Sequence, residues 1–193
     1  DLPKDPYLLF SKTVQSTEIT DEKKYINDEE NLDYILTSVS GLDLVGIYSS
    51  GYIYTGLANS LGQFNWHSDY SFSFDYSIYN ENNNAIKINY SSKKWKNEEF
   101  ETGLNQGIKK LKILSQSPRT IQKGEYRVYL EPSALNEIID MMSWGGFSYK
   151  ANKIGTSPLH LLSKGEKSLA TLVSIDENIK DGISANFSAC LLY

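Results

Sequence analysis

Residues 71–78 read SFSFDYSI, with an apolar side chain at every second position. The apolar positions are Phe72, Phe74, Tyr76 and Ile78, and serine or aspartate lies between them. Because successive side chains of a strand point to opposite faces, this alternation predicts a half-buried antiparallel strand. The stretch therefore places a β-sheet with one apolar face at the centre of the fold.

The same two-residue period recurs on both sides of this stretch. It predicts further strands over 42–47, 52–55, 64–66 and 86–90. Short polar segments separate these runs and predict turns at 49–51, 59–62 and 80–84. Together they predict a meander of about four or five strands.

Three other segments have the helical period. Thr20 is the expected N-cap of a first helix that Gly41 ends. Asn97 is the expected N-cap of a second helix, whose apolar positions are Phe100, Leu104, Ile108, Leu111 and Leu114. Its Gly103 and Gly107 are four residues apart and permit close approach to a strand.

Pro132 is expected to open a third helix, which Gly145 and Gly146 end. Two more strands are predicted over 124–130 and 169–175. This order of elements predicts an α+β fold, with an antiparallel meander and helices packed on one face. The expected organisation is an arm or linker over residues 1–19 and a single domain over 20–193.

Composition excludes several classes of protein. The 193 residues include 14 Tyr, 7 Phe and 3 Trp, which is atypical of a disordered chain. No apolar run is long enough to predict a membrane helix. Residues 87–127 hold ten basic and four acidic side chains, but only two of the 19 basic residues in the chain are arginine. We therefore expect a solvated surface there and no nucleic-acid partner.

No complete active site is visible in the sequence. Its two histidines, His67 and His160, lie far apart, and neither belongs to a zinc-peptidase motif. Cys190 is the one cysteine, which excludes an internal disulfide and a cysteine-rich zinc site. No nucleophile elbow, phosphate loop or dinucleotide fingerprint occurs. We expect no cofactor, no metal site and no catalytic residue.

Two segments resemble a known family. Residues 52–62, YIYTGLANSLG, are similar to the strand and Asn-Ser-x-Gly turn of the TldD/PmbA family. Residues 123–134, KGEYRVYLEPSA, resemble that family's Gly-x-Tyr-x-Val-x-Leu-x-Pro-x-Ala segment. The order of elements over roughly residues 20–180 is also similar, which implies a fragment of a longer family chain.

The resemblance implies a function and a partner. TldD-type members carry a His-Glu-x-x-x-His zinc motif in the helix that follows the proline, whereas residues 136–144 here contain no histidine. The chain therefore resembles the PmbA (TldE) type, a non-catalytic subunit of a cytoplasmic metallopeptidase system that processes peptides. Its expected partners are a zinc-bearing TldD-like subunit or a second copy, and peptides are possible substrates. The family's label as a modulator of DNA gyrase does not imply direct DNA binding.

The candidate binding residues are Asn59, Ser60 and Gly62 in the turn, and Glu137 and Asp140 on the third helix. Without histidine neighbours, the two carboxylates are more typical of a solvated helix face. An alternative hypothesis is a secreted or surface binding module that uses the Tyr- and Asn-rich strands, because aromatic and amide groups suit flat polar ligands. Ordinary sheet packing also explains these tyrosines. We further expect exposed apolar surface at 132–142 and 191–193.

Overall fold

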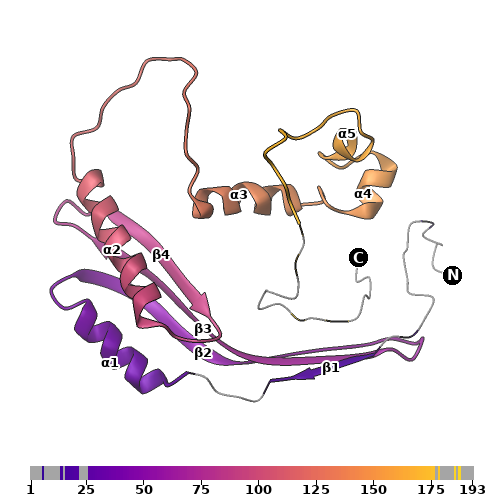
Figure 1. The fold of residues 1–193 in the computed structure, drawn as a ribbon, viewed down its shortest axis with the longest axis horizontal. Helices are drawn as coiled ribbons and strands as arrows, with labels where there is room; N and C mark the ends of the chain where they lie inside the picture. Colours follow the sequence, from indigo (N-terminus) through magenta and orange to yellow (C-terminus); the bar gives the residue numbers. More distant parts are fainter. Residues whose placement is uncertain are drawn as a thin grey trace. The chain divides into compact units, whose positions relative to one another are not determined.

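The computed structural model describes residues 6, 14, 16–21, 26–176, 178, 185 and 187 (Figure 1). The fold is α+β, with a four-stranded sheet and helices, as the sequence predicts. The sequence predicts one domain over 20–193, whereas the chain divides into two compact units. The sheet unit contains the described residues of 14–121 and 178–188, and the helical unit those of 1–13 and 122–177.

The central strand of the sheet is β3 (Phe64–Tyr79). Strand β2 (Asp43–Ala58) pairs with it antiparallel over the whole length of both strands. The other edge of β3 carries β4 (Ala85–Ser92), which is antiparallel, and β1 (Thr17–Thr20), which is parallel. The predicted meander is thus formed by β2, β3 and β4, and the expected arm contributes a parallel strand instead of a purely extended segment.

The predicted turn at 49–51 is wrong, because these residues lie inside β2. Ser49, Ser50 and Gly51 pair with residues 71–73 of β3 in an unbroken register. Their small side chains fit the sheet as well as a turn, and the strand periodicity continues through them. The turns at 59–62 and 80–84 are confirmed, with Gly62 at φ +87° and Asn83 at φ +61°.

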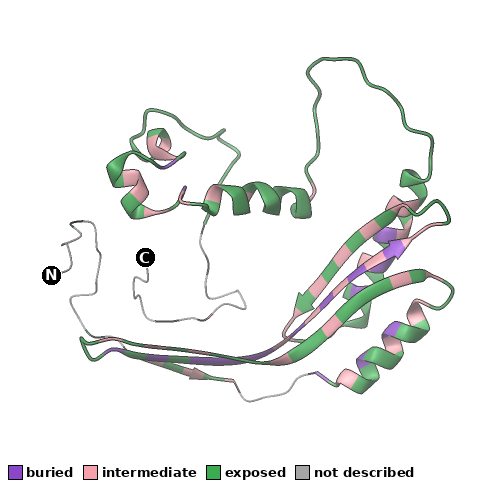
Figure 2. Cartoon of the chain, turned by 180° about the vertical axis from the view of Figure 1, so that it is seen from behind, coloured by how far each residue is buried: buried purple, intermediate pink, exposed green. Residues whose placement is uncertain are grey.

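Two helices cover one face of the sheet, as predicted. They are α1 (Asp28–Ser38) and α2 (Asn97–Leu114). Buried residues run along the centre of β3 and the sheet-facing sides of both helices (Figure 2). The main core consists of Ile35, Phe74, Tyr76, Ile78, Phe100 and Leu104. We call this side of the sheet the helix face.

Both predicted helix caps shift in the structure. Thr20 pairs with Ser68 as the last residue of β1, so the predicted helix start is wrong, and α1 begins at Asp28. The N–H of Asp21 donates to the Ser68 carbonyl at 3.1 Å, which extends the pairing beyond β1. Asn97 is the first residue of α2 and not its N-cap, which is Lys96.

The glycines of α2 allow the close approach that the sequence predicts. A Cβ atom on Gly107 would lie 2.3 Å from Ile88 Cδ1 and 3.3 Å from Ile78 Cδ1. The helix backbone therefore rests directly on the side chains of β3 and β4.

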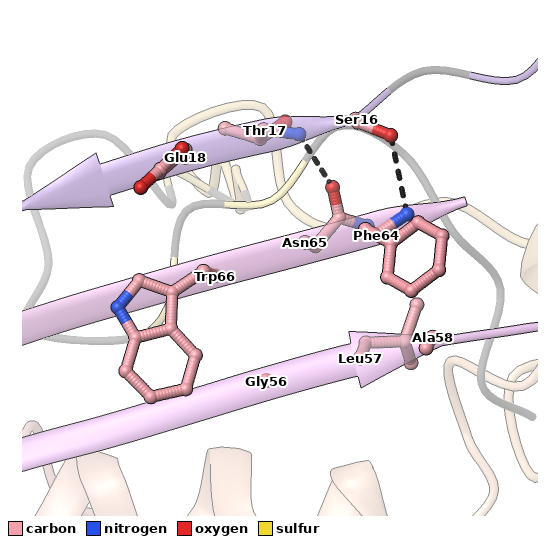
Figure 3. Close-up of a pocket in the computed structure, with 9 residues that line it drawn as sticks. All are labelled: Ser16, Thr17, Glu18, Gly56, Leu57, Ala58, Phe64, Asn65 and Trp66. Atoms are coloured by element: carbon pink, nitrogen blue, oxygen red, sulfur yellow. Dashed lines mark hydrogen bonds between the residues drawn. The ribbon is translucent and has the colours of Figure 1, made fainter. Parts of the chain in front are cut away.

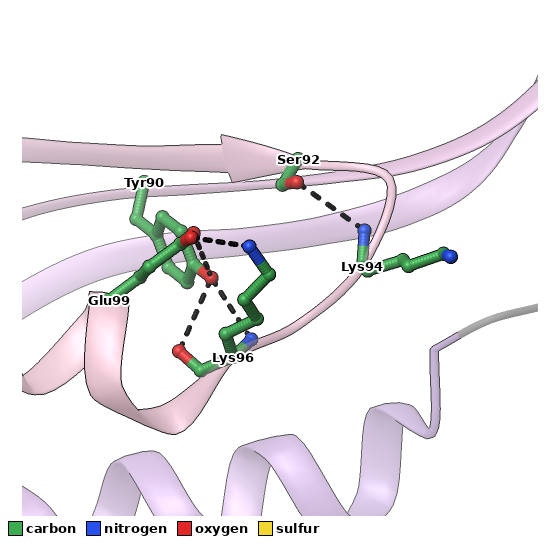
Figure 4. A network of polar contacts seen from close by, with 5 residues as sticks. All are labelled: Tyr90, Ser92, Lys94, Lys96 and Glu99. Atoms are coloured by element: carbon green, nitrogen blue, oxygen red, sulfur yellow. Dashed lines mark hydrogen bonds and ion pairs between the residues drawn. The ribbon is translucent and has the colours of Figure 1, made fainter.

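A polar network joins the end of β4 to the start of α2 (Figure 4). The Tyr90 hydroxyl accepts a hydrogen bond from the Lys96 N–H at 3.0 Å and lies 3.2 Å from Glu99 Oε2. Lys96 Nζ pairs with Glu99 Oε1 at 2.6 Å, and this contact lowers the pKa of Glu99. Partial burial raises the pKa of Tyr90. The network fixes where α2 begins relative to the sheet.

The helical unit contains α3 (Pro132–Ser143), α4 (Tyr149–Ile154) and α5 (His160–Ser163). Helix α3 begins at Pro132 as predicted, and Gly145 follows it with φ +87°. The Gly146 carbonyl accepts hydrogen bonds from Ser157 Oγ at 2.7 Å and Asn152 Nδ2 at 2.9 Å. These two bonds tie α4 and the segment before α5 to the chain that follows α3.

The strands predicted over 124–130 and 169–175 are wrong. Both segments are irregular, and most of their residues are exposed; Tyr129 is 83% exposed and Leu172 98%. An isolated extended segment needs a neighbouring strand for its backbone groups. The described part of the helical unit contains no strand that could supply one.

Candidate functional site

Four aromatic rings follow one another across β2 and β3 on the helix face, and we call them the aromatic strip. They are Tyr70, Tyr52, Tyr54 and Trp66. The ring centroids are 4.8 Å apart for Tyr70 and Tyr52, 5.8 Å for Tyr52 and Tyr54, and 5.9 Å for Tyr54 and Trp66. Each step lies within the range of direct aromatic contact.

The strip exists because small residues lie opposite the large rings. Ser68 is the register partner of Tyr54, and Gly56 is the register partner of Trp66. A Cβ atom on Gly56 would lie 3.2 Å from Trp66 Cε3, so the indole passes directly over the glycine. Each ring can therefore lean across the neighbouring strand instead of pointing straight out of the sheet.

Of the four rings only that of Tyr70 is buried, and the three rings beyond it are accessible. Tyr70 is 5% exposed, whereas Tyr52 is 38%, Trp66 43% and Tyr54 61% exposed. At this end of β3 the buried side chains lie on the face opposite the helices. They are Asn65, His67 and Asp69. The outer strip is thus an accessible aromatic surface on a rigid strand pair.

A groove of about 630 Å³ lies at the outer end of the strip (Figure 3). Three neighbouring strands line it, with Ser16, Thr17, Glu18, Gly56, Leu57, Ala58, Phe64, Asn65 and Trp66. Its volume falls within the range of small-molecule sites. Glu18 is exposed and is the register partner of Trp66, so the groove has one carboxylate among its lining residues.

Side chains of β1 and β3 fix the walls of this groove. Asn65 Oδ1 accepts a hydrogen bond from the Thr17 N–H at 2.8 Å, and Ser16 Oγ accepts one from the Phe64 N–H at 3.1 Å. Both bonds extend the pairing of β1 with β3 at its N-terminal end. They make the groove a preformed feature of the sheet.

The inner end of the strip is anchored by the first turn of α1. The carboxylate of Asp28 accepts hydrogen bonds from Tyr48 at 3.1 Å, Ser50 at 2.6 Å and Tyr70 at 3.2 Å. Burial is the main cause that raises the pKa of Tyr48, so its hydroxyl remains a donor. This cluster positions Tyr70, against which the ring of Tyr52 packs edge to face.

The charge around the strip is acidic. From Tyr25 to Ile86 the sequence contains no lysine or arginine. The carboxylate of Asp28 lies at the inner end of the strip, whereas Asp69 and Asp75 lie on the opposite face of β3 and pair with Lys93 and Lys87. Phosphate groups are bound through lysine, arginine or helix N-termini. The strip therefore suits an uncharged or cationic ligand and not a nucleic acid.

The predicted binding residues of the turn have a structural role. Asn59 Oδ1 accepts hydrogen bonds from the N–H groups of Leu61 at 3.0 Å and Gln63 at 3.2 Å. Asn59 Nδ2 donates to Gln63 Oε1 at 3.1 Å, and Gly62 supplies the positive φ. Ser60 is exposed at the tip. These residues shape the hairpin end that adjoins the groove, and they do not line the groove.

The other predicted residues, Glu137 and Asp140, belong to the helical unit. Asp140 Oδ2 accepts a hydrogen bond from Asn136 Nδ2 at 2.9 Å, and Glu137 is exposed on α3. His160 Nδ1 lies 3.0 Å from the Asn152 carbonyl, as expected of a packed histidine. Within the described residues, no three His, Cys, Asp or Glu side chains form a group that could hold a metal ion.

The sequence predicts that Tyr52, Tyr54 and Trp66 lie in strands, but it does not predict that their rings lie next to one another. The available signal was the pair Tyr52 and Tyr54 followed by Phe64 and Trp66, at the same two-residue spacing. The register of the hairpin is needed to bring the two pairs side by side.

Comparison with known proteins adds no relative: no family model, curated protein or solved structure matches this sequence. The resemblance to the TldD/PmbA family therefore stays a prediction. No helix in the described part of the chain has both the length and the apolar composition needed to span a bilayer.

Proposed function

We propose that this chain is a non-catalytic binding module whose aromatic strip holds an uncharged oligosaccharide. The observation that carries the proposal is the row of accessible rings Tyr52, Tyr54 and Trp66 beside the groove that Glu18 lines. A pyranose ring presents a face of C–H groups, which packs on an aromatic ring, and a rim of hydroxyls. Rigid aromatic side chains supply such contact area at low cost in conformational entropy.

Polar groups along the strip complement hydroxyls. Glu18 is an exposed acceptor and the register partner of Trp66, and Thr20 is exposed beside Ser68. The absence of lysine and arginine from Tyr25 to Ile86 favours a neutral glycan over a sulfated or phosphorylated one.

The test is a titration of the full chain with four neutral hexasaccharides: cellohexaose, xylohexaose, mannohexaose and chitohexaose. We expect saturable binding of at least one, weakened at least tenfold by Trp66→Ala and by Tyr54→Ala. The matched control is Trp144→Ala, because Trp144 is 85% exposed and lies in the helical unit.

Two outcomes contradict this function. One is the absence of binding to all four sugars, and the other is an equal loss of binding in Trp66→Ala and Trp144→Ala. A decaproline peptide is titrated in parallel, because proline-rich segments also dock on aromatic grooves. Binding of that peptide alone at the strip would assign the module to peptide ligands.

A second candidate function is the peptidase subunit that the resemblance implies. What supports it is the apolar side of α3, where Leu135 is 47% exposed, Ile138 38% and Met141 66%, as the sequence predicts. Such a surface is typical of a helix that docks on a partner. The residues 191–193 of the same prediction lie outside the described part of the chain.

The peptidase proposal is tested by incubating the chain with unstructured peptides, with and without zinc. We expect no cleavage by the chain alone, and cleavage that a chelator abolishes once a subunit with the His-Glu motif is added. Cleavage by the chain alone that Glu137→Ala abolishes would contradict a non-catalytic role.

A further inference from the structure

Among the described residues, no strand pairs with the outer edge of β2. In the described part of the chain β2 pairs with β3 only, whereas the second edge of β3 is covered by β1 and β4. The register of β2 with β3 runs from Asp43 to Ala58 without a bulge. An edge strand of 16 residues in unbroken register is a template for pairing with another strand.

This edge lacks the features that protect the edge strands of monomers. Its only charged residue is Asp43, at one end, and it contains no lysine and no proline. Val45 is 60% exposed, Ile47 75% and Ile53 54%, all on the face opposite the helices. An edge with one charged residue, at its end, and with exposed β-branched residues is expected to have a partner.

The hydrogen-bond pattern shows which backbone groups point outward. The Asn59 N–H donates to the Gln63 carbonyl at 3.2 Å, which sets the hydrogen-bonded pairs of this hairpin at odd-numbered residues of β2. The even-numbered residues therefore direct their N–H and C=O groups to the open edge. Gly46, Tyr48, Tyr54 and Gly56 are among them.

The flank of α1 beside this edge is also apolar. Tyr34 packs against Phe100 of α2, and Leu32 and Leu36 lie on the opposite side of α1 by helical periodicity. Leu32 is 41% exposed and Leu36 67%. Exposed apolar side chains therefore occur on α1 as well as on the opposite face of β2.

We propose that β2 pairs antiparallel with β2 of a second copy of this chain, about a two-fold axis through Ser50. In this register each Ile47 lies opposite the partner's Ile53, so the two exposed isoleucines of the edge cover each other. Every contact occurs twice, as a two-fold interface requires.

The dimer forms one continuous sheet. Because the two-fold axis is perpendicular to that sheet, the aromatic strips of both copies lie on the same face. A long ligand can then engage two strips at once, which increases apparent affinity without a new contact. The pairing itself does not depend on what the strip binds.

The test is the mass of the full chain in solution by sedimentation equilibrium, over a range of concentrations. We expect a dimer of the 21.8 kDa chain. Ile47→Lys should weaken dimerisation at least tenfold, since each new lysine would face an apolar isoleucine. The double variant Ile47→Lys, Ile53→Glu should restore it, because each lysine then faces a glutamate of the other copy.

Two further variants make the result specific. Ile113→Lys is the matched control, since Ile113 is 66% exposed on α2 and away from β2; it should leave the dimer intact. The double variant Ile47→Lys, Thr55→Glu should not restore pairing. Thr55 lies opposite Ile47 only if the partner strand is shifted by two residues from the proposed register. Circular dichroism checks that each variant is folded. A monomer at every concentration, a dimer that Ile47→Lys leaves unchanged, or rescue by the Thr55→Glu variant alone would overturn the proposal.

Discussion

Gly46 marks the tightest contact between two strands of the sheet. A Cβ atom at this position would lie 2.5 Å from Tyr76 Cβ and 2.9 Å from the Asp75 carbonyl oxygen. Both neighbours are close to or part of the backbone, so neither can rotate away. Gly51 lies on the same strand, and nothing lies within 4 Å of a Cβ atom built there.

We predict opposite effects of alanine at these two glycines. Gly46→Ala should lower the free energy of unfolding by about 2 kcal/mol or more, because the strands must separate to admit the methyl group. Gly51→Ala should leave it unchanged or raise it by up to about 1 kcal/mol, since alanine loses less backbone entropy on folding. Urea unfolding of both variants measures the difference, and equal effects would contradict the close contact.

Tyr76 is a buried tyrosine whose hydroxyl has no hydrogen-bond partner among the described residues. Its burial raises the pKa of the phenol from 10.0 to about 12. The neutral form is therefore favoured in the folded protein, and the unfolded chain ionises first. This effect costs no stability below pH 10 and destabilises the fold as the pH rises from about 10 to about 12.

We predict that Tyr76→Phe raises the free energy of unfolding by about 1 kcal/mol at pH 7, because it removes an unpaired buried hydroxyl. The variant should also lose less stability than the wild type between pH 10 and pH 12. Thermal unfolding across this pH range provides the measurement. A lower stability of the variant at pH 7 would mean that the hydroxyl has a partner in solution.

Individual residues also show which structural features the sequence predicts correctly. The alternation from Phe72 to Ile78 predicts the buried face of β3 correctly, because one strand face meets the helices along this stretch. The predicted capping role of Thr20 is wrong because this residue pairs with β3 instead of capping a helix. Local chemistry allows both outcomes, and only the tertiary partner decides between them.

At the level of elements, the hairpin turn between β2 and β3 depends on one asparagine. We predict that Asn59→Ala lowers the free energy of unfolding by about 1 kcal/mol, because two backbone N–H groups lose their acceptor. Asn59→Asp keeps the acceptor and is the control. Chemical denaturation of the two variants tests this, and an equal loss in both would show that the acceptor is not the stabilising group.

The aromatic strip illustrates what the sequence could not supply. The tyrosines at 52 and 54 and the aromatics at 64 and 66 were visible as two separate period-2 pairs. Their assembly requires a 16-residue hairpin in one register, and the predicted turn at 49–51 had divided β2 into two short strands. The site was therefore hidden by an error in strand length and not by any unusual residue.

At the level of the whole molecule, the chain consists of two units joined through an irregular segment. Residues 116–130 contain no helix or strand and are exposed. The sequence suggested a strand here because Tyr126, Val128 and Leu130 alternate with polar residues. Periodicity alone does not provide the neighbouring strand that the backbone needs.

We predict that trypsin cleaves the chain first between residues 116 and 130. Cleavage after Arg119, Lys123 and Arg127 should precede cleavage after Lys87 and Lys110, because the latter lie in β4 and α2. Mass spectrometry of a short time course identifies the order. Early cleavage inside the sheet unit would contradict its stability as an independent unit.

The central claim is that the aromatic strip binds a ligand, and the indole N–H signals of the three tryptophans test it most directly. Trp66 lies in the strip, Trp95 is hydrogen-bonded to Asn97 within the sheet unit, and Trp144 lies in the helical unit. A nitrogen-15 correlation spectrum, assigned by single Trp→Phe variants, is recorded during titration with each neutral hexasaccharide. The account predicts that one sugar shifts the Trp66 signal saturably and leaves the Trp144 signal in place. A Trp66 signal that stays fixed with all four sugars, or shifts no more than that of Trp144, would contradict it.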